Sequence, residues 1–471
     1  PSHGAGRNET SAVDRESLAG TEDRGNVKKQ CKKTWIQMLG IVVLSIFCGM
    51  LLLLITGLIP KSMIEDSCRE SSVYFQEHEL FPYLVDGQFN TRQDNYADCI
   101  LVNILYHIDG KNLPASLIKA SYYNPGMESV EVSLMESMQA EQTPNVDYFR
   151  YWHGGMVLLR PLFVFTGIQG ARAVLGVVLL ILTGLTVFLL WRQKAKGLAV
   201  CYVLGNLVVQ AWMCAFCIEY ITTFLLMNVV LIALLVYFPK RKDTESLYRH
   251  VYGMLCAAGV WTCFFDFLTT ETLTVTMPIL FLLVLRYQKG ELENLRQECK
   301  RGMGCLLGWG ISYAVTFVTK WLLAVMVLGR QAFMQAMESA GERIGGTVYL
   351  GNTTADPEAS GVQRFFGAIF RNQGSLFPFR DSMGTGAAAL SFFGVLFLCF
   401  AIVYLFRGKN FDGRAVVLCL LVGAVPYLRY AVLENHAYLH YFFTYRAQLV
   451  TVTMLLFVTY EFGLKNLRKI S

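Results

Sequence analysis

The stretch WIQMLGIVVLSIFCGMLLLLITGLI, residues 35–59, decides the fold class of this chain. It contains no charged side chain, and a helix of about 20 apolar residues is long enough to cross the hydrocarbon layer of a membrane. The run is longer than the core of a signal peptide and no clear cleavage site follows it, so we expect it to remain as a first membrane span. Four basic residues stand directly before it: Lys28, Lys29, Lys32 and Lys33.

Similar apolar blocks recur along the rest of the chain. Hydrophobic residues make up 54% of the 471 residues and charged residues only 16%, whereas soluble domains carry about 25% charged residues. We therefore predict an all-α fold, a polytopic transmembrane helical bundle over residues 35–471 with about ten spans. Residues 1–34 are polar and poor in aromatic side chains, which is typical of a disordered tail. The further predicted spans are 170–191, 198–218, 221–238, 250–267, 272–287, 303–328, 386–406, 414–433 and 447–463.

Short basic clusters between the apolar blocks predict the orientation. Lys and Arg gather in the cytoplasmic loops of membrane proteins, and every cluster falls on one side if the N-terminus is cytoplasmic. We therefore expect a multi-pass protein with both termini in the cytoplasm and two external segments, about 60–169 and 329–385. These clusters also explain the net charge of +6, and no nucleic-acid-binding motif is present, so no nucleic acid partner is expected. The clusters include Arg192, Lys194 and Lys196, then Lys240, Arg241 and Lys242, then Arg286, Lys289, Arg296, Lys300 and Arg301, and finally Arg407, Lys409, Arg414, Lys465, Arg468 and Lys469.

Each external segment contains an apolar stripe at helical spacing. One lies in 98–108 and the other in 361–371, where Arg364 and Arg371 stand beside the apolar positions. Such a helix can lie in the headgroup plane of a membrane, or its stripe can pack against the rest of the external region. The residues leave both interpretations open.

Ionisable side chains inside the predicted spans lie in their outer halves, where they predict a polar cavity that opens outward. The alternative is that each side chain reaches the outer headgroups separately. Lys320 is the only lysine well inside a span, and its charge requires an anion, either a protein carboxylate or a lipid phosphate. The outer-half residues are Glu219, Asp266, Glu271, Lys320, Arg429 and Glu434.

Three clusters in the segments around the spans add candidate site residues. Asp94 and Asp98 share a helix face at a spacing of four, which suits a general base; the alternative is a helix N-terminus that favours acids. The second cluster places aromatic rings beside Arg, either as a membrane-boundary belt or to hold a sugar and a phosphate. It comprises Arg150, Trp152, His153 and Arg160.

The third cluster runs from Glu434 through His436 and His440 to Tyr445 and Arg446. Two histidines four residues apart on a helix could bind a divalent metal, but a third ligand in a known metal-site pattern is missing. We therefore assign no metal site and no cofactor. Two cysteines of the first external segment, Cys68 and Cys99, could form a disulfide or remain as free thiols.

The layout resembles the GT-C superfamily of integral-membrane glycosyltransferases, which includes protein O-mannosyltransferases and lipid A aminoarabinose transferases. The likeness covers residues 35–463 as architecture, and at motif level it rests on Asp94-Asn95 with Asp98. In this family an early acid of the first external loop is the catalytic base, which implies that role for Asp94. The chain departs from the family in two respects, because Asn95 replaces a second adjacent acid and no large soluble domain follows the last span.

The resemblance implies an inverting transfer of a sugar from a polyprenyl-phosphate-linked donor to a glycan, lipid or protein acceptor on the outer face. Membrane lipids would surround the donor tail, and the phosphate would meet outward-facing cations such as Lys320, Arg429 and Arg446. Parts of the chain also look like uncharacterised multi-span proteins of Gram-positive anaerobes, so we expect a bacterial plasma membrane. The alternatives are a transporter or flippase of lipid-linked glycans, or a polymerase or ligase. A polymerase or ligase would use the basic second external segment, which contains Arg330, Arg343, Arg364, Arg371 and Arg380.

Overall fold

The apolar blocks form long helices in the computed structural model, which describes residues 35–108, 110–126, 129–345, 361–408 and 411–467. Within these residues, seven helical segments are long and apolar enough to cross a membrane. Each lies over a predicted span, so the all-α membrane bundle is confirmed. The predicted tail, residues 1–34, falls outside the described residues. The seven segments are Trp35–Gly57, Ile168–Arg192, Ile218–Lys240, Leu295–Leu328, Arg380–Phe406, Gly413–Val432 and Tyr441–Leu464.

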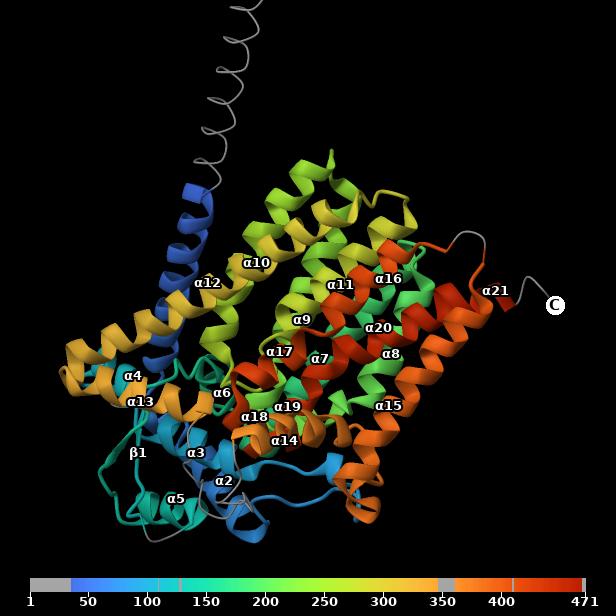
Figure 1. The fold of residues 1–471 in the computed structure, drawn as a ribbon. Helices are drawn as coiled ribbons and strands as arrows, with labels where there is room; N and C mark the ends of the chain where they lie inside the picture. Colours follow the sequence, from blue (N-terminus) through green and yellow to red (C-terminus); the bar gives the residue numbers. More distant parts are fainter. Residues whose placement is uncertain (1–34, 109, 127–128, 346–360, 409–410, 468–471) are drawn as a thin grey trace, which may run out of the picture.

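All of these segments except the first are found by their labels in Figure 1. The first helix is blue and unlabelled; the others are α7 (Ile168–Arg192), α9 (Ile218–Tyr237) with η4 (Phe238–Lys240), α12 (Leu295–Leu328) and α15 (Arg380–Phe406). The last two segments are divided into α16 (Gly413–Gly423) and α17 (Val425–Val432), and into α19 (Tyr441–Thr444), η5 (Tyr445–Gln448), α20 (Leu449–Thr459) and η6 (Tyr460–Leu464), followed by α21 (Lys465–Leu467).

Helices also occupy the remaining predicted spans. They are α8 (Lys196–Val208), which η3 (Ala211–Phe216) follows, α10 (Thr244–Phe265) and α11 (Leu273–Gln288). α8 and α11 are apolar but shorter than a full span, so the number of spans stays a prediction. α11 forms the centre of the bundle, because every residue from Leu273 to Arg286 is buried.

Short polar side chains set where several helices begin. Asp243, Asn294 and Asp412 precede α10, α12 and α16, and each accepts a hydrogen bond from the backbone N–H three residues later, at 2.7, 2.9 and 3.3 Å. Such caps satisfy one of the free N–H groups at a helix start. Inside α15, Gly384 has φ +85°, a conformation that favours glycine, and it separates a short first part from the apolar part.

The two long segments between spans gather at one end of the bundle, which we call the loop end (Figure 1). The first of them also contains a short antiparallel pair, β1 (Ser121–Tyr122) and β2 (Val146–Asp147). Its helices are η1 (Lys61–Met63), α2 (Glu65–Glu77), η2 (Phe89–Thr91), α3 (Asn95–Tyr106), α4 (Leu113–Lys119), α5 (Val130–Gln139) and α6 (Gly155–Leu162). The second segment contains α13 (Gln331–Gly345) and α14 (Gly361–Gly374), and α18 (Glu434–Leu439) lies beside them.

The structure distinguishes the two interpretations of the apolar stripes. In α3 the stripe packs into the protein, since Leu101, Ile104 and Leu105 are at most 2% exposed. In α14 the outer apolar positions remain open, with Val362 67% and Phe366 49% exposed. α3 is therefore a packing helix, whereas α14 keeps the exposed apolar face that an interfacial helix requires.

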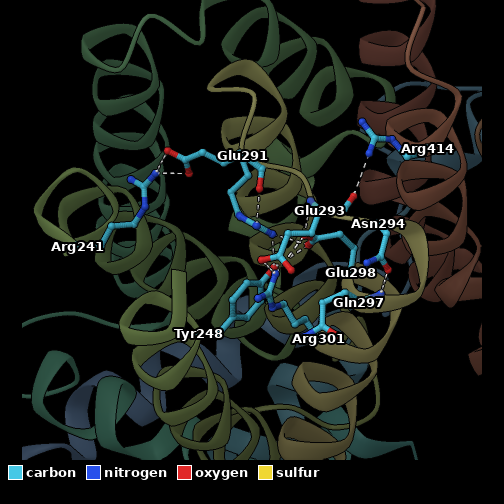
Figure 2. Close-up of polar contacts among 10 residues, drawn as sticks. Arg241, Tyr248, Glu291, Glu293, Asn294, Gln297, Glu298, Arg301 and Arg414 are labelled. Atoms are coloured by element: carbon cyan, nitrogen blue, oxygen red, sulfur yellow. Dashed lines mark hydrogen bonds and ion pairs between the residues drawn. The ribbon is translucent and has the colours of Figure 1, made fainter. Parts of the chain in front are cut away.

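The opposite end of the bundle is held by a network of ion pairs (Figure 2). Arg286 at the end of α11 pairs with Glu298 of α12, and both side chains are 0% exposed. Arg301 pairs with Glu293 at 2.7 Å and with Glu298 at 3.2 Å. Arg241 adds a pair with Glu291, and Arg414 donates to the Glu293 carbonyl at 3.2 Å. These basic residues belong to the predicted cytoplasmic clusters, but the side of the membrane on which they lie stays a prediction.

Candidate functional site at the loop end

Asp94 is the N-cap of α3 and also reaches the start of α9. Its Oδ1 accepts a hydrogen bond from the Ala97 N–H at 2.9 Å, and its Oδ2 accepts one from the Tyr220 hydroxyl. The side chain is 4% exposed. Burial raises the pKa of Asp94, while the hydrogen bonds from Tyr220 and Ala97 oppose the rise. The helix-cap interpretation is confirmed, and both oxygens of this carboxylate accept hydrogen bonds from neutral groups.

Asp98 has a different environment, although it lies one turn further along α3. Arg172 of α7 donates to its Oδ2 from Nε at 2.8 Å, and the Ile218 N–H donates to its Oδ1 at 2.8 Å. Arg172 also donates to Asn95 at 2.9 Å. Asp98 thus joins α3, α7 and α9, and it differs from Asp94 in having a charged partner, the Arg172 guanidinium.

A second polar group lies around Arg429. Its Nε pairs with Glu271 at 2.8 Å, and its Nη2 donates to the Leu268 carbonyl at 2.5 Å. The same Nη2 lies 3.4 Å from Nδ1 of His436. Burial, together with the positive charges of Arg343 and Arg429, lowers the pKa of His440 to about 3, so this imidazole is neutral near pH 7.

Aromatic rings join the Asp94 and Arg429 groups. The ring of Tyr220, which donates to Asp94, lies 4.9 Å from that of Phe443. Phe443 stacks on His440 with centroids 5.2 Å apart, and His440 lies 4.6 Å from His436. Asp94, Arg429 and His436 thus belong to one continuous cluster, which we call the loop-end cluster.

Glu219, which the sequence placed only among the outer-half residues of a polar cavity, is a further carboxylate of this cluster. It lies in the first turn of α9, close enough to Asp94, Asp98 and Asp266 for their charges to act on it. Among the described residues, its carboxylate has neither a hydrogen bond nor an ion pair. Its position at an outer span end was the available signal, whereas nothing in the sequence indicated Tyr220.

An apolar groove of about 400 Å³ opens beside the cluster between α12 and α13. Its polar residues include Arg150, Ser339 and Arg343. The Nε atoms of both arginines are buried without an acceptor in the described part of the chain, while Nη1 of Arg343 donates to the Ser339 carbonyl at 2.9 Å. Arg343 lies 5.8 Å above the ring of Tyr151. The groove therefore combines an apolar wall, which suits a hydrocarbon chain, with two guanidinium groups. The apolar lining includes Tyr151, Leu268, Tyr313, Phe317, Val318, Trp321, Met337, Ile344 and Leu433.

Tyr148 connects this groove with the carboxylates. Burial raises the pKa of Tyr148, and Glu219 adds to the rise while Arg150 and Arg343 oppose it. The charges that act on Tyr148 thus include one carboxylate of the cluster and both groove arginines. Its ring lies 5.7 Å from Tyr151 and 5.2 Å from the Arg150 guanidinium.

His153 is held in an unusual backbone conformation, with φ +56°. Its Nε2 lies 2.7 Å from the Tyr148 carbonyl, which can only accept, so Nε2 carries the proton. The Nδ1 atom is buried and has no hydrogen-bond partner among the described residues. Burial lowers the pKa of His153 to about 3. Strain and an unpaired acceptor together are typical of functional positions.

The partner of Lys320 differs from the carboxylate or phosphate that the sequence predicted. Its Nζ donates to the carbonyls of Leu117 and Ile118, at 3.3 and 2.8 Å, near the end of α4. It also lies 5.6 Å from the Trp152 ring. A cation is favourable at a helix C-terminus, so backbone carbonyls take the place of the expected carboxylate or phosphate.

Two residues of the second cluster also have structural partners instead of the expected ligand. Arg160 donates to the Ile59 carbonyl at 2.6 Å and to the Leu105 carbonyl at 2.8 Å. Trp152 donates to the Thr316 carbonyl at 3.0 Å. These contacts fix the first external segment to the bundle and leave Arg150 and His153 as the candidates from that cluster.

The other predicted residues are mostly paired within the protein. Asp266 accepts hydrogen bonds from Thr223 and Thr269, and Glu434 pairs with Arg364 at 3.2 Å. The Tyr445 hydroxyl donates to the Val209 carbonyl at 3.1 Å. Arg446 donates to the Phe442 and Asn90 carbonyls, both at 3.3 Å, but its buried Nε has no acceptor in the described ranges. Of these four, Arg446 alone retains a free donor toward the cluster.

Metal and thiol chemistry have little basis in the described residues. No group of three or more His, Cys, Asp or Glu side chains in them is arranged to hold a metal ion. Cys68 and Cys99 are both buried and free, so the possible disulfide is not formed. Cys99 instead lies 3.4 Å from the Val130 carbonyl.

Comparison with known proteins adds no name to this site. No family model, no curated protein and no solved structure matches the chain. The class that fold and site define is therefore a helical membrane protein with a polar cluster and an apolar groove at one end.

Proposed function

We propose that this protein is an integral-membrane glycosyltransferase that moves a sugar from a polyprenyl-phosphate-linked donor to an acceptor on the outer face. The observation that carries the proposal is the groove between α12 and α13, which ends on Arg150 and Arg343 beside the loop-end cluster. An isoprenoid chain suits the apolar wall, and a phosphate suits guanidinium groups whose Nε donors lack acceptors in the described residues.

In this proposal Asp94 is the general base. The acceptor hydroxyl gives its proton to the Asp94 carboxylate, and its oxygen forms a bond to the anomeric carbon from the face opposite the phosphate. The bond from that carbon to the phosphate oxygen breaks, and the electron pair leaves with the polyprenyl phosphate. Arg150 and Arg343 neutralise the charge that develops on the leaving phosphate. The configuration at the anomeric carbon is inverted.

The neutral partners of Asp94 support this assignment over Asp98. Burial raises the pKa of both carboxyl groups, but Asp94 has only neutral hydrogen-bond donors as partners. Asp98 shares its charge with Arg172 at 2.7 Å, which reduces its tendency to take a proton. Glu219 lies close enough to serve as an alternative base if Asp94 only positions Tyr220.

One observation favours a second candidate, a polymerase or ligase that uses a lipid diphosphate. The Arg380 guanidinium lies 4.0 Å from the Phe89 ring and 4.3 Å from the Tyr441 ring. Its Nε and Nη1 are buried without an acceptor in the described residues. A further unpaired cation at the loop end suits a carrier with a second phosphate.

Binding of the carrier tests the proposal. The purified chain in phosphatidylcholine nanodiscs would be titrated with undecaprenyl phosphate, undecaprenyl diphosphate and neutral undecaprenol, and complexes would be counted by native mass spectrometry. We expect the monophosphate to bind at least about tenfold more tightly than undecaprenol, since a charged hydrogen bond contributes roughly 1.5–3 kcal/mol. Arg343→Gln should remove most of this preference. Arg192→Gln, an exposed arginine at the end of α7, is the matched control.

The outcomes separate the candidates. Preference for the monophosphate supports the glycosyltransferase, whereas a further tenfold preference for the diphosphate that Arg380→Gln abolishes supports the polymerase or ligase. Equal binding of undecaprenol and undecaprenyl phosphate would reject both. Transfer is then measured as release of undecaprenyl phosphate from undecaprenyl-phosphate hexoses.

A further inference from the structure

A second groove lies at the end of the bundle opposite the loop end. It has a volume of about 580 Å³ and runs between the first helix, Trp35–Gly57, and α10. It lies far along the chain and the fold from Asp94 and the α12–α13 groove, so nothing in the proposed transfer reaction uses it. Its lining comprises Gln37, Met38, Gly40, Ile41 and Leu44 of the first helix, and Arg249, His250, Gly253 and Met254 of α10.

The groove runs along the contact between the two helices, and at its floor a Cβ on Gly253 would lie 3.0 Å from Ile41 and 3.8 Å from Met38. Val42 packs with Cys256 and Val260 in one buried cluster. Nearer the loop end the contact is tighter, since a Cβ on Gly49 would lie 2.9 Å from the Phe264 ring. A Cβ on Gly40, by contrast, would meet nothing within 4 Å. Gly40 therefore faces open space on the side where the groove lies.

The walls of the groove are suited to hydrocarbon. Leu39, Val43 and Leu44 of the first helix are 64%, 59% and 61% exposed. In a helix that crosses a membrane, such side chains face acyl chains. The groove thus continues from the lipid-facing surface of the first helix into the space beside α10.

The rim of the groove is basic. Arg249 is exposed and has neither an ion pair nor a hydrogen bond among the described residues. His250 is fixed beside it, since its ring stacks on Tyr237 at 4.3 Å and its Nδ1 lies 2.7 Å from the Tyr237 hydroxyl. The acids nearest in sequence are Asp243, whose carboxylate caps α10, and Glu245 in the first turn of that helix.

Arg249 is thus a cation without a counter-charge among the described residues, at the edge of an apolar groove. A basic group that flanks an apolar groove at the end of a membrane helix is the arrangement that attracts anionic lipid headgroups. The positive charge at the rim of the groove therefore favours an anionic lipid over a neutral one.

We propose that this groove binds an anionic phospholipid, with an acyl chain between the first helix and α10 and the phosphate at Arg249. The polar edge of Gln37 and His250 marks the headgroup level, while Met38, Ile41 and Leu44 contact the chain. The lipid would add to the contact that Met38 and Ile41 of the first helix make with Gly253 of α10. The site is independent of the proposed transfer reaction.

The experiment compares two lipids with the same acyl chains on the purified full chain. Dioleoyl phosphatidylglycerol and dioleoyl phosphatidylcholine are titrated separately, and bound lipids are counted by native mass spectrometry. We expect phosphatidylglycerol to bind more tightly, and Arg249→Gln to weaken it roughly fivefold, the factor for one cation near an anionic headgroup. Phosphatidylcholine binding should not change in this variant.

Groove filling gives a second, independent variant. Gly40→Leu places a side chain in the open space, so it should remove tight phosphatidylglycerol binding without a clash inside the protein. Gly394→Leu on α15 is the matched control, because Gly394 is also exposed and its Cβ would also meet nothing within 4 Å. The melting temperature of each variant in detergent reports whether the fold is intact.

The proposal is overturned if the two lipids bind equally to the parent protein. It is also overturned if Gly40→Leu, with an unchanged melting temperature, binds phosphatidylglycerol as the parent does. Loss of binding in Arg249→Gln and in Gly40→Leu, but not in Gly394→Leu, supports it. None of these results depends on whether the protein transfers sugars.

Discussion

Replacing Asp98 by asparagine should lower the stability of the fold strongly, whereas the same replacement of Asp94 should leave it almost unchanged. The substitutions are the same in chemistry and lie one turn apart on α3. Asp98 is 0% exposed and pairs with Arg172, which is 5% exposed. Asp94 accepts hydrogen bonds only from neutral groups, the Ala97 N–H and the Tyr220 hydroxyl.

The structure gives the magnitude of each effect. Asp98→Asn keeps an oxygen for the Ile218 N–H but leaves the Arg172 guanidinium buried without a counter-charge, which costs about 3–5 kcal/mol. Asp94→Asn keeps an oxygen for Ala97, and the Tyr220 hydroxyl can turn, so about 1 kcal/mol or less is lost. The double variant Asp98→Asn/Arg172→Gln removes the stranded charge and should regain more than about 1 kcal/mol over Asp98→Asn.

Reversible unfolding in mixed micelles with a titrated denaturing detergent measures these free energies. The parent, both single variants and the double variant are compared in one detergent at one ionic strength. If Asp98→Asn unfolds at the same detergent fraction as the parent, the buried ion pair does not stabilise the fold. The assignment of Asp98 to a structural role would then be wrong.

Four further outcomes are expected, the first three from contacts described above and the last from the predicted topology. Asp94→Asn should lower the transfer rate by about 10²–10⁴ with little change in unfolding; full activity in the purified variant would move the role of base to Glu219. Lys320→Met should lower stability by about 1–3 kcal/mol, because two carbonyls lose their donor, and should leave undecaprenyl phosphate binding unchanged; weaker binding without lost stability would restore the phosphate role. Glu298→Gln should cost about 3–5 kcal/mol at any salt concentration, since it strands the fully buried Arg286; a cost that disappears in high salt would contradict the buried pair. A cysteine introduced at Gln88 should be labelled only from outside, and labelling only from the cytoplasm would reverse the topology.

Much of the fold could be predicted because membrane insertion depends on local sequence. Apolar blocks such as 35–59 are long enough to specify a helix by themselves, and the helices lie where these blocks do. Whether an apolar stripe is buried or interfacial could not be predicted in this way, because it depends on which residues of the fold pack against the stripe. The stripes of α3 and α14 have the same spacing, yet Leu105 is 0% exposed and Phe366 is 49% exposed.

The site could be predicted in its residue types but not in its pairings. Asp98 and Arg172 are 74 positions apart, and Lys320 meets carbonyls 202 and 203 positions away. Backbone carbonyls have no signature in the sequence, so the partner of Lys320 could not be read from it. The helix cap at Asp94 follows from a local motif, whereas Tyr220 reaches this residue only through the tertiary fold.

The guanidinium groups without acceptors at the loop end also affect how the protein must be handled. Arg150, Arg343 and Arg380 retain donor atoms that have no acceptor in the described residues, and sulfate, phosphate and citrate offer the oxygens that match them. A preparation in such a buffer starts with competing anions at these positions. Samples exchanged into chloride should bind sulfate with released heat in a calorimeter, and carrier affinities measured in phosphate buffer will be systematically too weak.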